Sequence, residues 1–479
     1  MNPGPPPAPR RLKRLMLRAG AVAGFERFAP DPADSSVEID AAPRPGHRPR
    51  AVGDPLGQAV VLAVSAPDDA AGGAVGPAVR LEAFGGAKQV GRRWGQAVEG
   101  VWEFPGLLLT PGLVNAHVHL DLWDAGRWPR VGGFTDWVGR LRKTTGPWDP
   151  AAWAKSRQRG RAQAVAAGTA AVGDIVAGPA APRSEAPRGG AGQPTAASAV
   201  AVGPWLGGVA FAELFGLGPP HDEAALRLIH SSTSNKNQTP GSGGVTPSVG
   251  AGGGLIAGWQ PHAPYSAGPA VYAAAGAAGR AVSTHLAETL EEAEFVRRGT
   301  GPFRDLLESI GKWSPGFLPD YRGARSPVAW MEPHLRARRW LAAHVNYADD
   351  ADIALLAETR TSVAYCPIAS EYFGHRGHRY RDMLAEGVNV CLGTDSSVCQ
   401  PPGEPQPLGV LPQMRRLYRR DGVAPETLLE MATINGWRAL GQAPDLRRLC
   451  AVAIDAADPR PPLQQAMESH APATGIEVA

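Results

Sequence analysis

The sequence is poor in cysteine and lacks the cysteine pairs that bind zinc. Its 479 residues include four cysteines, and none of them stands in a Cys-x-x-Cys pair. This pattern excludes a disulfide framework and a cysteine-based zinc module as the organising element of the fold. We expect free thiols in a reducing compartment and therefore predict a cytoplasmic protein. The cysteines are Cys366, Cys391, Cys399 and Cys450.

Long apolar runs are also missing. No segment has 18 consecutive apolar residues, so the sequence predicts no membrane-spanning helix. Residues 1–14 are basic and rich in proline, and Arg18 interrupts the apolar run that follows them. A signal peptide needs an uninterrupted apolar segment, so we expect none here. The sequence thus predicts no membrane association.

The sequence has no large excess of positive or negative charge. The formal net charge is +3, which is small for this length, and only 6 of the 48 basic residues are lysines. With 59 glycines and 47 prolines, the arginine content reflects a compositional bias rather than a binding patch. No nucleic-acid partner is therefore expected. Hydrophobic residues make up 43% of the chain, which is enough for a large core.

The pattern of predicted secondary structure changes near residue 107. Residues 15–104 hold short strand-like runs, such as 59–64 and 78–84, which predict a small β module. Beyond it, short apolar strands alternate with helical stretches, the pattern of βα units around a parallel sheet. Eight such units predict an α/β fold, a (β/α)8 TIM-type barrel with its active site at the carboxyl ends of the strands. The expected strands are 113–119, 169–176, 207–214, 254–260, 281–286, 340–345, 361–366 and 388–393.

The tail of the chain is expected to return to the N-terminal module. Apolar runs at residues 449–454 and 475–478 are predicted to be strands that complete it. We therefore divide the chain into an N-terminal part at 1–104, the barrel at 105–440 and a C-terminal part at 441–479.

Two low-complexity stretches interrupt the barrel. Residues 178–199 are rich in Ala, Pro and Gly, and residues 231–253 are rich in Ser, Thr, Asn and Gly. Such compositions do not build a packed core, so both stretches are predicted to be surface insertions.

His117 and His119 end the first expected barrel strand. Residues at positions i and i+2 of a strand point to the same face, so their two imidazoles project together. Neutral imidazole is a good ligand for zinc, iron and nickel. The alternative is that these are two ordinary histidines in a buried strand.

Four further polar residues stand at or just after other strand ends. Together with His117 and His119 they converge on one end of the predicted barrel, and a charged aspartate after an apolar strand needs a cation partner. Three imidazoles and one carboxylate can hold a divalent metal with room for a water, whose pKa the metal lowers. The additional residues are His262, His285, His344 and Asp395.

Glu288 stands three residues after His285, just beyond the strand end. A carboxylate there can accept a proton from an activated water. The alternative reading is a solvated residue that starts the acidic helix 288–294.

Taken together, the motifs resemble those of the amidohydrolase superfamily, in the branch of cytosine deaminase and chlorohydrolase-type aminohydrolases that use one metal. The matching pieces occur in the order His117-x-His119, His262 in His-x-Pro-Tyr-Ser, His285-x-x-Glu288, His344, and Asp395 in Leu-Gly-Thr-Asp-Ser. The resemblance covers about residues 105 to 440. It implies that the flanking segments form a composite β-sandwich.

The resemblance also implies roles. By position, the metal ligands would be His117, His119, His285 and Asp395, holding one divalent zinc or iron ion per chain. Glu288 would shuttle the water proton to a ring nitrogen, and His344 would orient the attacking group. Asp395 would take a second proton and help ammonia leave, whereas His262 would face the substrate. The implied enzyme is a hydrolase of carbon–nitrogen bonds in cyclic amidines, acting on a small heterocyclic substrate.

Fragments such as Thr284-His285-Leu286-Ala287-Glu288-Thr289 and Tyr365-Cys366-Pro367 are similar to those of aminodeoxyfutalosine deaminase-like members, which deaminate an adenine nucleoside derivative. Two alternatives stay open. Hydrolytic dechlorination of a triazine-like ring uses the same site, and a non-catalytic scaffold is a third class. A two-metal hydrolase is disfavoured, because Lys236 is the only lysine between strands 3 and 5 and it lies inside an insertion.

Other residues near the predicted mouth have weaker assignments. Glu213 and Phe215 close the third strand, where they would touch substrate or serve as a helix cap or core residues. Trp123 and Trp128 follow the first strand, where they would form a wall under a planar ring or pack beneath a loop. The oligomeric state stays open, with a homo-oligomer as one expectation. Two histidines expected to be solvated loop residues are His375 and His378.

Overall fold

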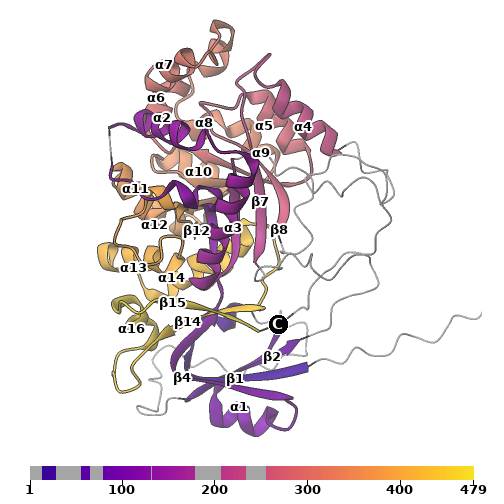
Figure 1. Ribbon diagram of the computed structural model, residues 1–479, viewed down its shortest axis with the longest axis vertical. Helices are drawn as coiled ribbons and strands as arrows, with labels where there is room; N and C mark the ends of the chain where they lie inside the picture. Colours follow the sequence, from indigo (N-terminus) through magenta and orange to yellow (C-terminus); the bar gives the residue numbers. More distant parts are fainter. Residues whose placement is uncertain are drawn as a thin grey trace, which may run out of the picture.

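Two β-sheets organise the computed structural model of the protein (Figure 1). The larger is a curled parallel sheet of nine strands, and the smaller is a mixed sheet of six strands. The structure describes residues 13–28, 56–64, 79–130, 132–177, 206–233 and 255–478. The predicted insertion 178–199 lies outside the described residues, as do residues 234–253 of the second insertion.

The larger sheet contains all eight strands predicted from the sequence, with ends that differ by at most two residues. They are rich in small and branched apolar residues and mostly buried, as expected for a parallel sheet covered on both faces. The strands are β5 (Leu113–His119), β6 (Thr169–Val176), β7 (Gly207–Leu214), β8 (Leu255–Pro261), β9 (Ala281–Leu286), β10 (Leu341–His344), β11 (Ser362–Tyr365), β12 (Val390–Leu392) and the short β13 (Asp395–Ser396).

The two edges of this sheet come from adjacent pieces of chain. The strand order is β12-β11-β10-β9-β8-β7-β6-β5-β13, and only Gly393 and Thr394 separate β12 from β13. Strand β13 pairs in parallel with β5, and the amide of Thr394 donates to the carbonyl of His117 over 3.0 Å. The sheet therefore curls back on its first strand, which is consistent with a TIM-type barrel.

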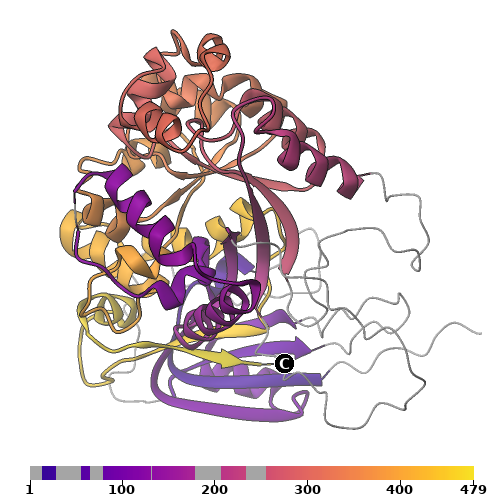
Figure 2. The ribbon, with the colours of Figure 1, turned by 45° about the horizontal axis from the view of Figure 1, so that its top comes forward.

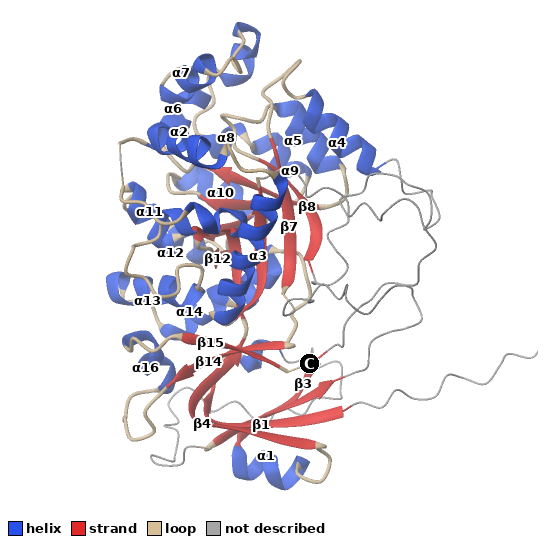
Figure 3. Cartoon of the chain, viewed as in Figure 1, coloured by secondary structure: helices blue, strands red, loops and turns tan. Residues whose placement is uncertain are grey.

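Helices lie outside the strands of the larger sheet (Figure 3). Among the described residues, no helix is both long enough and apolar enough to cross a membrane. In chain order the helices of this part are α2 (Phe134–Thr145), α3 (Pro150–Ala166), α4 (Glu223–Thr233), α5 (Pro269–Ala277), α6 (Leu290–Arg298), α7 (Pro302–Ser309), α8 (Pro327–Trp330), α9 (Glu332–Ala337), α10 (Asp350–Glu358), α11 (Pro367–Phe373), α12 (Tyr380–Ala385), α13 (Val410–Asp421), α14 (Pro425–Ala432) and α15 (Ile434–Ala439).

Helix ends follow local side-chain chemistry. Helix α3 begins after Asp149, whose carboxylate accepts from the amide of Ala152, with proline in the first turn. Helix α6 begins after Thr289, whose hydroxyl accepts from the amide of Glu292. It ends at Gly299, which adopts a left-handed φ of 65° that glycine tolerates without a Cβ clash.

The smaller sheet combines segments from both ends of the described chain, in the order β15-β14-β4-β1-β2-β3. The predicted tail strands therefore do join the N-terminal module. The expected sandwich of two packed sheets is not confirmed, because the described strands of this part form a single sheet. Its strands are β1 (Lys13–Val22), β2 (Gln58–Val64), β3 (Val79–Gly86), β4 (Gly100–Pro111), β14 (Arg448–Ala453) and β15 (Ala473–Glu477).

Two helices of this part were not expected from the sequence. Helix α1 (Ala87–Trp94) covers one face of the small sheet (Figure 1), where Ala87 and Val90 pack with Met16 and Val61. Glycines precede and interrupt α1, and glycine is a poor helix former. The sequence therefore gives only a weak helical signal here. Helix α16 (Pro462–Glu468) lies between β14 and β15 in the chain.

The two sheets share buried contacts. Strand β4 ends at Pro111, and β5 starts two residues later, so the chain passes directly from the small sheet into the large one (Figure 2). Leu108, Cys450 and Val452 of the small sheet belong to the same hydrophobic cluster as the barrel core. The small sheet therefore packs under the barrel, at the end opposite to the carboxyl ends of its strands.

Candidate active site

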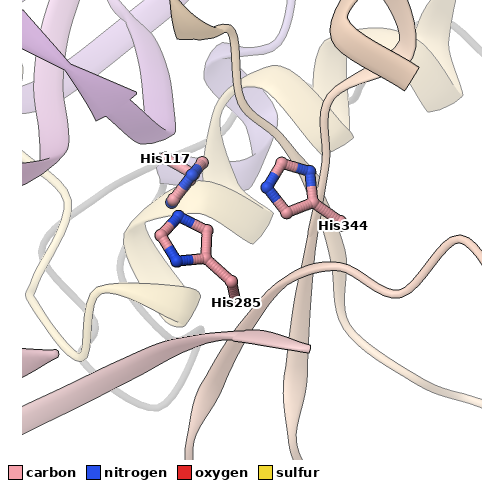
Figure 4. Close-up of side chains that lie close together, drawn as sticks. All are labelled: His117, His285 and His344. Carbon is pink, nitrogen blue, oxygen red and sulfur yellow. The ribbon is translucent and has the colours of Figure 1, made fainter. Parts of the chain in front are cut away.

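The four predicted metal ligands and His344 meet at the carboxyl ends of the barrel strands. The structure brings His117 and His119 from β5 together with His285 from β9, His344 from β10 and Asp395 from β13. Within each of two overlapping groups, the potential ligand atoms lie within 4.8 Å of one another. The first group is His117, His285 and His344, which point toward one another in Figure 4, and the second is His117, His119 and Asp395.

The nitrogens of this cluster lack the partners that buried polar atoms normally have. Among the described residues, neither nitrogen of His117 has a hydrogen-bond partner, and the same holds for Nδ1 of His119 and Nε2 of His344. The His117 side chain is fully buried. Orphaned buried nitrogens carry a free-energy penalty, which a bound cation would remove. The donor set therefore fits a metal ion.

Burial keeps these imidazoles neutral. It lowers the pKa of His119 to about 3 and that of His285 to about 4. For His117, burial and the neighbouring His285 together lower the pKa well below the usual value. A neutral imidazole has a free lone pair, which is the form that binds a metal.

The tautomer of His285 is set by the backbone. Its Nδ1 lies 2.9 Å from the carbonyl oxygen of His262, so Nδ1 carries the proton and Nε2 keeps its lone pair. Metal-binding histidines commonly have such a carbonyl behind them. A separate group of potential ligands, on the side of β7 and β8, also contains His285. Its members are Glu213, His262 and His285. Because His285 has one available nitrogen, the two groups compete for it, and this favours one metal over two.

Asp395 is held in an unusual backbone conformation. Its φ is 61°, in the left-handed region, and its Oδ1 accepts from the amide of Ser396 over 2.7 Å. The same Oδ1 lies 3.6 Å from Nε2 of His119, and the thiol of Cys399 donates to Oδ2 over 3.6 Å. Burial raises the pKa of Asp395 to about 6. A cation beside this buried carboxylate would restore its ionised form.

Glu288 lies against the same cluster. Its Oε1 is 3.5 Å from Nε2 of His344, and Glu288, His344 and Asp395 form another compact group of polar atoms. Glu288 is only 4% exposed. Burial, followed by the nearby charges of Asp395 and Glu292, raises the pKa of Glu288 well above its usual value. A carboxyl group with a raised pKa can both accept and return a proton near neutral pH.

His262 and Glu213 lie beside the cluster, on the side of β7 and β8. The His262 ring centroid is 4.8 Å from that of His285, and its Nε2 is 3.7 Å from Oε1 of Glu213. Nδ1 of His262 contacts the Ser266 hydroxyl over 2.5 Å. Burial raises the pKa of Glu213 to about 8. Phe215, 49% exposed, stacks on His262 with 4.8 Å between ring centroids.

Trp123 lies apart from this constellation. It is half-buried in the short 3-10 helix after β5 and packs against a cluster that includes Leu120, Ala164 and Leu408. On its other side it lines a cavity of about 290 Å³ with Arg127 and Ser397, among others. Among the described residues, no hydrogen bond or ring contact joins Trp123 to the histidine cluster, and its substrate role stays a prediction.

The residues of this site occupy a segment that matches a known family. The Amidohydrolase family matches residues 108–450 of the chain. The protein belongs to the amidohydrolase family.

Relatives of this amidohydrolase include nucleoside deaminases. It is 32% identical over 191 residues to the 5'-deoxyadenosine deaminase of Methanoregula boonei, a match that spans 38% of this chain and only 38% of the relative. It is 28% identical over 405 residues to the aminodeoxyfutalosine deaminase of Deinococcus radiodurans, covering 79% of this chain and 83% of the relative.

The fold is also similar to that of a solved structure, an adenosine deaminase of Xanthomonas campestris with bound zinc. The TM-score is 0.55 at 18% sequence identity, and the match covers 96% of this chain and 90% of the other. At this level of identity, the likeness concerns the fold.

Two histidines of the amidohydrolase are placed differently from the expectation. His375 and His378 were expected to be solvated, and this is wrong, because both are half-buried and packed near the site. His378 Nε2 donates to the carbonyl of His344 over 2.7 Å, and its ring stacks on Tyr365. The loop between α11 and α12 contacts the end of β10, a long-range contact that no local sequence pattern predicts.

Several residues around Glu288 and Asp395 were missed by the sequence reasoning. They form hydrogen bonds to Glu288, to Asp395 or to each other, and they belong to no recognised sequence motif. One local signal was available: Thr289-x-x-Glu292 has the spacing of a capping box at the start of a helix. The residues are Glu292, Asn346, Ser370 and Cys399.

Proposed function

We propose that this amidohydrolase is a metal-dependent deaminase that releases ammonia from the amino-substituted purine ring of an adenosine-like nucleoside. The observation that carries the proposal is the position of Glu288. Its carboxyl group, with a raised pKa, lies 3.5 Å from His344 beside a cluster of neutral imidazoles and Asp395. The deaminase relatives support the same reaction class.

The residues proposed to hold the metal are His117, His119, His285 and Asp395. Three neutral nitrogens and one carboxylate suit a divalent zinc or iron ion, and the zinc in the Xanthomonas campestris deaminase supports this assignment. When bound, the ion supplies a Lewis acid that lowers the pKa of water.

The proton transfers are assigned to three side chains. As water adds to the amino-bearing ring carbon, Glu288 takes a water proton and delivers it to the adjacent ring nitrogen. The Nε2 atom of His344, which has no hydrogen-bond partner among the described residues, orients the oxygen that is added. Asp395 takes the second proton of that oxygen and passes it to the amino group. The carbon–nitrogen bond breaks, ammonia leaves, and the ring keeps a carbonyl oxygen.

The substrate is proposed to enter along a row of rings. From the buried His344 the row passes to His285, then to His262, and ends at the exposed Phe215, with successive centroids 5.5, 4.8 and 4.8 Å apart. The reacting ring belongs at the inner end, where the cluster is. The sugar and its 5' substituent then lie at the outer end, with Glu213 offering its carboxyl group beside His262.

The two sheets are proposed to have different roles. We propose that the curled sheet closes as a (β/α)8 barrel within residues 105–440 and carries the chemistry. The N-terminal part, which β4 continues as far as Pro111, and residues 441–479 supply the small sheet, whose contacts with the barrel lie away from the site. A composite sandwich remains our proposal for this part.

The test is ammonia release by purified, metal-loaded protein over a panel of ring amines and one chlorinated ring. The panel contains aminodeoxyfutalosine, adenosine, methylthioadenosine, adenine, cytosine, guanine and a chlorotriazine. Glu288→Gln is the test variant, and Glu291→Gln, on the same segment, is the matched control. We expect release from the nucleosides that falls by at least about 100-fold in the test variant and is unchanged in the control.

Other outcomes of this panel decide between the alternatives. Chloride release from the triazine without ammonia release from any nucleoside would replace the deaminase with a chlorohydrolase. Protein that holds one metal per chain and is inactive on the whole panel would overturn the nucleoside assignment. Protein that binds no metal would overturn the enzyme proposal itself.

A further inference from the structure

Glu292 is a buried carboxylate that the proposed reaction does not use. It lies in the first turn of α6 and is fully buried. Its Oε1 accepts from the amide of Ala287 over 3.0 Å, and its Oε2 accepts from the amide of Glu288 over 2.8 Å. One oxygen therefore holds the amide of the residue proposed to move protons, and the other holds the amide of the residue before it.

This arrangement differs from ordinary helix capping. In a capping box, the glutamate at the third helical position accepts from the amide of the N-cap residue, here Thr289. Glu292 also reaches beyond Thr289 to the amides of the two residues before it, and the Thr289 hydroxyl caps the helix by accepting from the amide of Glu292 over 3.1 Å. The carboxylate thus fixes the segment between β9 and α6 rather than only starting the helix.

That segment needs fixing because its backbone is strained. Ala287 has a φ of 48°, in the left-handed region that residues with a Cβ seldom adopt. Strain of this kind persists only when surrounding contacts hold it. Each of the two amides donates to its own oxygen of Glu292, so this one side chain holds both peptide groups of the strained segment.

The carbonyl side of Glu288 is held as well. Asn346, two residues after β10, donates from Nδ2 to the carbonyl oxygen of Glu288 over 3.0 Å. Its Oδ1 accepts from the hydroxyl of Ser370 over 2.8 Å, and both side chains are buried. The peptide groups on either side of Glu288 are therefore clamped by the segments that follow β9, β10 and β11.

We propose that Glu292 is a positioning residue that sets the Glu288 carboxyl group against His344 by holding the amides of Ala287 and Glu288. The inference rests on the proposed function only in assigning the proton transfers to Glu288. A shift of about 1 Å in a reacting group can lower a rate by about 100-fold, so loosening this clamp affects turnover more than binding.

The main test is Glu292→Gln in the metal-loaded, full-length protein. Glutamine keeps the shape but has only one acceptor oxygen. One of the two hydrogen bonds to the backbone is therefore lost, and the side-chain NH2 group faces a backbone N–H. We expect kcat to fall about 10- to 100-fold, with KM within about twofold and metal content unchanged. Glu294→Gln, on the same helix, is the matched control and is expected to behave as wild type.

A double variant separates positioning from a general structural role. If Glu292 acts through Glu288, adding Glu292→Gln to Glu288→Gln produces no further loss of kcat, because the group being positioned is gone. Independent, multiplying losses would overturn the proposal. Thr289→Ala removes the normal cap of α6 and is expected to lower the melting temperature without the kcat loss. An equal kcat loss in Thr289→Ala would assign the effect to the helix instead.

The outcomes also separate this inference from the proposed function. Full activity of Glu288→Gln would remove the proposed function, and the positioning role with it. Loss of activity in Glu288→Gln with normal kcat in Glu292→Gln would overturn the positioning role alone. If circular dichroism shows Glu292→Gln unfolded, Glu292→Asp, which keeps the carboxyl group but is one methylene shorter, takes its place with the same expected kcat loss. Failure of both to fold would assign Glu292 to folding and overturn the proposal.

Discussion

The imidazole of His285 donates through Nδ1 to the carbonyl oxygen of His262, with the two atoms 2.9 Å apart. His262 directly follows β8, and His285 is the fifth residue of β9, so the neighbouring strand fixes the tautomer of the histidine. The consequence is an Nε2 lone pair that is available before any ion arrives. A preorganised ligand of this kind binds more tightly than one that must first choose its protonation state.

Replacing His285 is expected to abolish metal binding. His285→Asn keeps a polar side chain but cannot place a nitrogen where Nε2 was. We expect metal content to fall from one ion per chain to a small fraction, with roughly a 100-fold or greater loss of ammonia release. The measurements are elemental analysis after dialysis and the ammonia assay. His470→Asn changes an exposed histidine and is expected to leave both values unchanged. Full metal content in His285→Asn would contradict the ligand assignment.

The metal-free protein is expected to lose stability as the pH falls below about 6.5. Burial lowers the pKa of His285 to about 4 in the folded state, so between pH 6.5 and 4 the unfolded chain binds a proton that the folded chain does not. Stability therefore rises with pH through this window and is lost as the pH falls. At pH 5, His285 alone accounts for about 2 kcal/mol of this loss.

Urea unfolding at pH 7 and pH 5 measures this effect. The comparison of wild type with His285→Asn isolates the histidine, because Glu213 and Glu292, whose pKa values are raised to about 8, act in the opposite direction in both proteins. For these carboxyl groups stability is lost as the pH rises from about 4.5 to 8. The variant is expected to lose less stability than wild type between pH 7 and 5. Equal losses would show that His285 is not buried as a neutral group.

Phe215 is expected to contribute to recognition of the sugar side of the substrate. Phe215→Ala removes the exposed ring that stacks on His262 at the outer end of the row. A contact of about 1 kcal/mol corresponds to roughly a fivefold rise in KM for an adenosine-like nucleoside, with kcat little changed. Trp102→Ala, an exposed aromatic of the small sheet, serves as the control. An equal rise in KM for free adenine would place Phe215 against the reacting ring rather than the sugar.

The barrel strands could be predicted because their signal is local. Strands such as β5 and β7 are short apolar runs bounded by breakers, and their buried faces follow from that composition. Closure was harder to foresee in detail. Gly393 lies so close to β5 that an added Cβ would be 2.9 Å from Cβ of His117, and this requirement depends on two strands far apart in the sequence.

The site was foreseen in its polar residues but not in their supports. His117, His119, His285, His344 and Asp395 were expected to converge, and the structure brings them together; their roles stay predictions. Glu292 received no role of its own from the sequence, and its burial became visible only with the segment before α6 in place. His375 and His378 were misjudged because their partners lie on other strands. The cytoplasmic location and a homo-oligomer also stay predictions.

The pairing of β13 with β5 has a consequence for the life of the chain on the ribosome. Asp395 aligns with Val118 and Ser396 with His119, so the cluster straddles the seam between the first and last strands of the barrel. Before residue 395 has left the ribosome, the nascent chain contains the four histidines of the cluster but lacks Asp395 and the pairing of β13 with β5. Because β14 pairs with β4 still later, the small sheet is sealed only after the seam. The proposed metal site is therefore assembled only after the chain has been synthesised past residue 395.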